Sequence, residues 1–97
     1  MTKDEFIKII KDEYIEVDKI CDLIVELEDI KLDIITHYFF ENELAEHPES
    51  GWYCHICEHT YDEKYNFWNY EEGTKVFNHC SMRDAVISCI CIFFNIE

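Results

Sequence analysis

The chain has 97 residues, with 22 Asp and Glu against 8 Lys and Arg, and a formal net charge of −14. This length is typical of one domain with a thin core, and an apolar share of 48% argues against a disordered chain. Nucleic acids and anionic membranes are bound through Lys and Arg, so the charge argues against binding to either and favours a partner with a basic surface.

A capping box formed by Thr2 and Glu5 predicts a helix that begins at the N-terminus. Apolar residues at spacings of three and four continue this helix to about residue 25 as one amphipathic stripe. Residues 1–50 hold 15 acidic residues and 5 Lys. Because the stripe of this helix is apolar, its acidic residues lie on the other faces, which are strongly acidic. The stripe consists of Phe6, Ile10, Tyr14, Val17, Cys21 and Ile24.

Residues 27–36 fit two structures. Apolar residues at every second position, Ile30, Leu32 and Ile34, are typical of a strand, yet Ile30 and Ile34 also share one helix face with Tyr38. We favour a second helix that ends near Glu46, so that residues 1–47 form a helical hairpin turning at about residues 28–29. A strand within 27–36 stays the alternative.

Pro48 and Gly51 mark the boundary between this acidic helical part and a second part at 48–97. There, aromatic and β-branched runs at 65–70 and 75–77 flank a Gly-containing segment, Glu71-Glu72-Gly73-Thr74. This pattern predicts a β-hairpin whose turn is that segment.

A final helix is predicted from Met82 to about Phe94, with Ser81 as its N-cap. It is apolar on most faces, so we expect a buried, central helix. Three cysteines lie in apolar periodic runs and are predicted to belong to the core: Cys21, Cys89 and Cys91.

Four residues in the second part have spacings typical of a zinc site. Cys54-x2-Cys57 is followed after 21 residues by His79-Cys80. A Cys-x2-Cys turn holds two thiolates at the distance that zinc demands, and four protein ligands make a closed, structural site. We expect Zn²⁺ to stabilise the thin core, with His59 as a substitute ligand. The alternative is that these residues are buried thiols and surface imidazoles.

The fold expected from these elements is α+β. An N-terminal acidic helix or helical hairpin packs on a small zinc-stapled β-hairpin and a buried C-terminal helix, within a single domain at 1–97.

The window His55-Ile56-Cys57-Glu58-His59 also matches H-x-x-E-H, a zinc-hydrolase pattern that needs both His on one helix face. It overlaps the cysteine pair and has no helical pattern, and a short chain has little room for a substrate cleft. We therefore predict no enzymatic activity, and a small zinc hydrolase is a remote alternative.

Acidic side chains on a helix can imitate the phosphates of a nucleic acid, because helix positions one to two turns apart have comparable spacing. Bound carboxylates would then replace phosphates in contacts with Arg. The residues predicted to bind a partner in this way are Asp12, Glu16, Asp22, Glu26, Asp29 and Asp33. Four aromatic residues are candidates either for interface anchors or for core: Trp52, Trp68, Tyr65 and Tyr70.

A short, very acidic, Asn-, Ile-, Lys- and Glu-rich chain without an enzyme motif resembles phage-encoded anti-CRISPR proteins, and is most similar to the small inhibitors of type II-A Cas9. The Cys/His residues resemble a zinc-containing member of that class. The resemblance lies in size, charge and composition, and it transfers no functional residue. It implies stoichiometric binding to the effector and obstruction of target DNA loading or cleavage. A generic zinc-ribbon interaction module, whose acidity only confers solubility, is the alternative.

We expect the protein to act in the cytoplasm of a bacterial host. The first residues, Met-Thr-Lys-Asp-Glu, contain no apolar signal region. The longest apolar run, from Ala85 to Phe94, is much shorter than the ~20 residues that span a bilayer.

Overall fold

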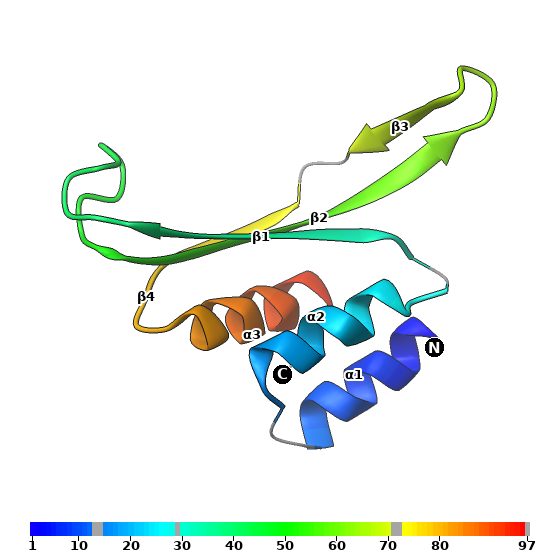
Figure 1. Cartoon of the computed structure of the whole chain (residues 1–97), viewed down its shortest axis with the longest axis horizontal. Coiled ribbons are helices and arrows are strands. Elements are labelled where there is room, and N and C mark those ends of the chain that lie inside the picture. Colours follow the sequence, from blue (N-terminus) through cyan, green and yellow to red (C-terminus); the bar gives the residue numbers. More distant parts are fainter. Residues whose placement is uncertain (13–14, 29, 71–72, 97) are drawn as a thin grey trace.

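The computed structural model is α+β, as predicted, and it describes residues 1–12, 15–28, 30–70 and 73–96. Across these residues, four antiparallel strands form one sheet, and three helices lie on one of its faces (Figure 1). The elements are α1 (Lys3–Asp12), α2 (Val17–Val25), β1 (Leu32–Phe39), β2 (Gly51–Asp62), β3 (Phe67–Tyr70), β4 (Thr74–His79) and α3 (Met82–Phe93).

The first helix begins as predicted but is not continuous to residue 25. Glu5 N–H donates to Thr2 Oγ1 at 3.3 Å, and the Thr2 hydroxyl donates to Glu5 Oε1 at 3.2 Å, which confirms the predicted helix start with Thr2 as its N-cap. However, α1 ends at Asp12, α2 starts at Val17, and Glu16 is extended with φ −69° and ψ 150°. The break allows both short helices to turn an apolar side toward the core.

This break changes which residues are buried in α2. A continuous helix would bury Cys21, whereas Ile20 is fully buried and Cys21 is exposed. The prediction that Cys21 is core is therefore wrong. The predicted helical hairpin that turns at residues 28–29 is also wrong, because the two helices precede that point. Asp29 itself lies outside the described residues.

Residues 32–39 form a strand, so the favoured second helix is wrong and the strand alternative is correct. β1 pairs antiparallel with β2 from Leu32 opposite Glu58 to Phe39 opposite Gly51. Alternation directs Ile34 toward the helices, where it packs against the core, and Ile35 toward the other face, where it is 51% exposed. This segment is a strand because its alternate side chains pack against the helices while its backbone pairs with the longer strand β2.

β2 is the central strand, and it pairs with all three others. Both predicted strands of the hairpin exist as β3 and β4, but each pairs with β2, so the predicted hairpin is wrong. The turn of the β2–β3 hairpin is instead at 63–66, where Asp62 Oδ1 accepts from the Lys64 and Tyr65 N–H groups at 3.0 and 3.3 Å. Glu71 and Glu72 of the predicted turn lie outside the described residues.

Gly73 is required where β4 begins, because it lies against the backbone of β2. A Cβ at this position would be 1.8 Å from the Ile56 carbonyl oxygen. Only glycine permits such an approach of two backbones.

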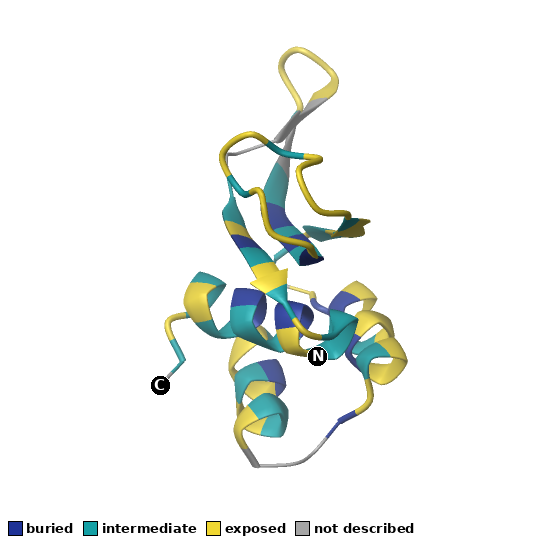
Figure 2. Ribbon diagram, turned by 90° about the vertical axis from the view of Figure 1, so that its left-hand side faces the viewer, coloured by how far each residue is buried: buried dark blue, intermediate teal, exposed yellow. Residues whose placement is uncertain are grey.

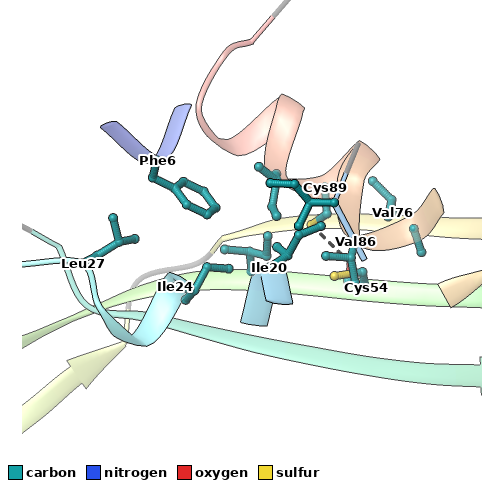
Figure 3. Packing of buried hydrophobic residues seen from close by; sticks show 12 residues of the cluster. Phe6, Ile20, Ile24, Leu27, Cys54, Val76, Val86 and Cys89 are labelled. Atoms are coloured by element: carbon teal, nitrogen blue, oxygen red, sulfur yellow. Dashed lines mark hydrogen bonds between the residues drawn. The ribbon is translucent and has the colours of Figure 1, made fainter. Parts of the chain in front are cut away.

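The C-terminal helix is confirmed. Asp84 N–H donates to Ser81 Oγ at 3.0 Å, so Ser81 is the N-cap. The buried side of α3 packs on β2 and β4, and residues from both the 1–47 and 48–97 parts contribute to the same core (Figures 2 and 3). Cys89 is fully buried as predicted, and Cys91 is half-buried. The buried cluster contains Phe6, Ile15, Ile20, Ile24, Leu27, Cys54, Ile56, Val76, Ala85, Val86, Cys89 and Ile90.

None of the helices in the described ranges has the length and apolar character needed to cross a lipid bilayer.

Candidate functional site

The predicted zinc ligands are not brought together. Cys54 and Cys57 lie within β2 and not in a turn. Residues three apart on a strand point to opposite faces, so Cys54 faces the helices and Cys57 faces the other side of the sheet. His79 ends β4, and Cys80 is exposed after it. Within residues 1–12, 15–28, 30–70 and 73–96, no three His, Cys, Asp or Glu side chains form a group suited to a metal ion.

The described structure therefore does not gather the four residues around one point. The substitute ligand His59 lies on the outer sheet face, where its Nε2 is 3.7 Å from Asp33 Oδ1. The same strand geometry separates the H-x-x-E-H residues. His55 and His59 share the outer face, whereas Glu58 points to the helix side. The helical arrangement that a zinc hydrolase of this pattern needs is absent from this segment.

Cys54 instead contacts Cys89 in the core (Figure 3). The Cys89 thiol donates to the Thr74 carbonyl oxygen at 3.2 Å and to the Cys54 carbonyl oxygen at 3.6 Å. A hydrogen bond with Cys89, together with burial, raises the pKa of the Cys54 thiol. Both side chains are fully buried, so they join α3 to the sheet as small, closely packed groups.

Three carboxylates form an exposed row on α2 and its C-cap. Asp18, Asp22 and Glu26 are four residues apart and exposed, so they lie on one side of the helix at intervals of about 6 Å. Asp22 and Glu26 belong to the predicted partner-binding set. Asp18 was not predicted, although its spacing of four residues from Asp22 was a sufficient signal. We call these three residues the α2 acidic row.

The other predicted acidic residues are only partly near this row. Glu16, the N-cap of α2, is exposed and precedes the first residue of the row by two positions. Asp33 lies on the outer sheet face, on the opposite side of the sheet from α2, so the predicted set does not form one surface. The Asp12 side chain and Asp29 lie outside what the structure describes.

The outer sheet face carries an aromatic groove that the sequence did not predict. Residues 44–47, in the loop after β1, and this face together line an open groove of about 490 Å³. His47 stacks on Phe77 with ring centres 3.9 Å apart, and the ring centres of Tyr53 and Phe77 are 5.0 Å apart. Of the four aromatic candidates for anchors, Tyr65 is 63% exposed in the β2–β3 turn, and Trp52 packs against the core. The Trp68 and Tyr70 side chains lie outside the described part.

A second groove separates α2 from β1. It has a volume of about 280 Å³ and is lined by Val17, Asp18, Cys21, Ile34, Thr36, Met82 and Val86. Its walls are mainly apolar, with one carboxylate of the α2 acidic row at the rim. We call it the β1–α2 groove.

Comparison with known proteins returns no match to a protein-family model, to a curated protein or to a solved structure.

Proposed function

We propose that this protein is a non-enzymatic inhibitor that binds a basic, nucleic-acid-handling protein, with type II-A Cas9 as the candidate target implied by its resemblance to anti-CRISPR proteins. The observation that supports this proposal is the α2 acidic row. Three exposed carboxylates at intervals of about 6 Å offer a repeated negative charge to a groove lined by Lys and Arg.

The helix–sheet core supports this role because it holds α2 in a defined position. Ile20 and Ile24 are buried at 0% and 5% exposure, which leaves the opposite side of α2 facing solvent. Cys54 is part of the same buried core. The protein would obstruct DNA loading or cleavage by occupying the site of the nucleic acid.

The test measures binding of the purified protein to a type II-A Cas9–guide complex at increasing salt. Affinity should fall steeply with ionic strength, because exposed charges provide much of the attraction. A double variant, Asp18→Lys with Asp22→Lys, should bind at least about tenfold more weakly.

The matched control is Glu41→Lys with Glu49→Lys, which changes two exposed carboxylates of the 40–50 loop. Both double variants change the net charge by four, from −14 to −10. Equal losses of affinity would show that only total charge matters, and salt-independent binding would contradict the proposal.

A further inference from the structure

The free edge of β1 presents unpaired backbone groups. In the described part of the sheet β1 pairs with β2 alone. His59 N–H donates to the Lys31 carbonyl oxygen at 3.1 Å, so the backbone groups of Lys31 and of every second residue after it point to β2. The intervening residues direct their N–H and C=O groups outward: Leu32, Ile34, Thr36 and Tyr38.

This edge has few of the features by which proteins block strand addition. β1 has eight residues, contains no Pro or Lys and has Asp33 as its one charged residue. It ends beside aromatic side chains that face solvent, since Tyr38 is 36% and Phe40 is 67% exposed. An exposed edge of this kind is a template for another strand.

The β1–α2 groove lies directly below this edge, on the helix side of the sheet. Ile34 and Thr36 form its β1 wall, and Val17, Asp18 and Cys21 form its α2 wall. An added strand would direct alternate side chains into this groove and the others past Ile35, which is exposed on the outer face. The site therefore offers hydrogen bonds, apolar contact and charge together.

The charge of the site specifies the side chains that fit. Carboxylates in the α2 acidic row repeat every four helix residues, or about 6 Å. Side chains on one face of a strand repeat every two residues, or roughly 6.6 Å. Lys or Arg at alternate positions of an added strand would thus match the row, with their apolar stems in the groove and their charges at the carboxylates.

A second copy of this chain fits the edge less well than a basic segment does. Each copy carries a net charge of −14, and edge pairing would bring two α2 acidic rows close together. Like charges at an interface disfavour that complex.

We propose that the β1 edge and the β1–α2 groove bind an extended segment of a basic protein as an added strand, with Lys or Arg alternating with apolar residues. This inference rests on the proposed function and specifies how the basic partner is recognised. Main-chain hydrogen bonds to β1 supply affinity, and the α2 acidic row supplies selectivity.

The first test uses the wild-type protein and an acetylated, amidated peptide with the repeat Lys-Val over eight residues. Amide exchange followed by NMR should show about tenfold greater protection of the outward N–H groups of β1, at Leu32, Ile34, Thr36 and Tyr38. The peptide with Glu in place of Lys should not bind. Binding of the Lys peptide without this protection would overturn strand addition.

The second test compares two variants of Thr36. Thr36→Pro removes an outward N–H but no bond to β2, whereas Thr36→Val keeps the N–H and the side-chain shape. Thr36→Pro should weaken peptide binding by about tenfold or more, and Thr36→Val should stay within about twofold. Equal affinities of the two variants would overturn the inference. So would a concentration-dependent dimer that Thr36→Pro abolishes, because a second copy would then occupy the edge.

The same variants separate this inference from the proposed function. If Cas9 binds Thr36→Pro as tightly as wild type but not the Asp18→Lys, Asp22→Lys variant, the proposed function stands and strand addition is overturned. If Cas9 does not bind wild type while the Lys peptide protects the β1 amides, the edge inference stands and Cas9 is the wrong target.

Discussion

The thiol of Cys89 in α3 lies against Cys54 in β2 and donates to its carbonyl oxygen at 3.6 Å, with both side chains fully buried. This contact involves Cys54, one of the four residues predicted to bind zinc. It joins the central helix to the central strand, so the two cysteines contribute to stability as apolar groups.

Replacing Cys54 by Ser should lower the free energy of unfolding by about 1–3 kcal/mol, because a hydroxyl costs more to bury than a thiol. Urea denaturation measures this value. Cys80→Ser is the control, because Cys80 is exposed and a surface change is within about 0.5 kcal/mol. Equal, large losses for the two variants would instead indicate that both bind a metal.

Removal of metal should leave the fold unchanged, because the four predicted ligands are dispersed over β2, β4 and the segment after β4. Circular dichroism before and after treatment with EDTA, together with metal analysis of the purified protein, checks this expectation. Stoichiometric zinc whose removal unfolds the chain would contradict the strand geometry at Cys54 and Cys57.

Stability should decrease at alkaline pH, and Cys57 should contribute to the decrease. Burial, with a further contribution from the Asp33 carboxylate, raises the pKa of this thiol. Below the unfolded value of about 8.5, both states hold the proton. At higher pH the unfolded chain loses it first, so the free energy of unfolding falls by up to ~1.4 kcal/mol per pH unit.

Urea denaturation at several pH values from neutral to about 10 measures that slope. Cys57→Ala should show a shallower fall than wild type, because the variant lacks the titrating group. Identical slopes in the two proteins would rule out Cys57 as the origin of the alkaline loss.

Gly73→Ala should destabilise the protein by about 3 kcal/mol or more, because its Cβ would overlap the Ile56 carbonyl oxygen and separate β4 from β2. The thermal unfolding midpoint measures the effect. Ser50→Ala, in the exposed loop before β2, should leave the midpoint nearly unchanged. A Gly73→Ala variant as stable as wild type would exclude this close approach of the two strands.

The sequence was sufficient to predict the features that depend only on residues close together in the chain. Thr2 with Glu5, and Ser81 with Asp84, satisfy backbone groups within one helical turn, so both helix starts were predictable. The apolar character of residues 85–90 likewise predicted that α3 is central. The acidic side of α2 was predictable in the same way, because the spacing of apolar residues along a helix indicates which side faces solvent.

Pairing and ligand geometry were decided by the tertiary structure. Ile34 is compatible with a helix or a strand until β2 supplies the partner whose hydrogen bonds make it a strand. Cys54 and Cys57 have the spacing of a zinc turn, but incorporation into β2 directs their thiols to opposite faces. Spacing along the chain determines which residues can meet, whereas contacts between distant segments determine which of them do.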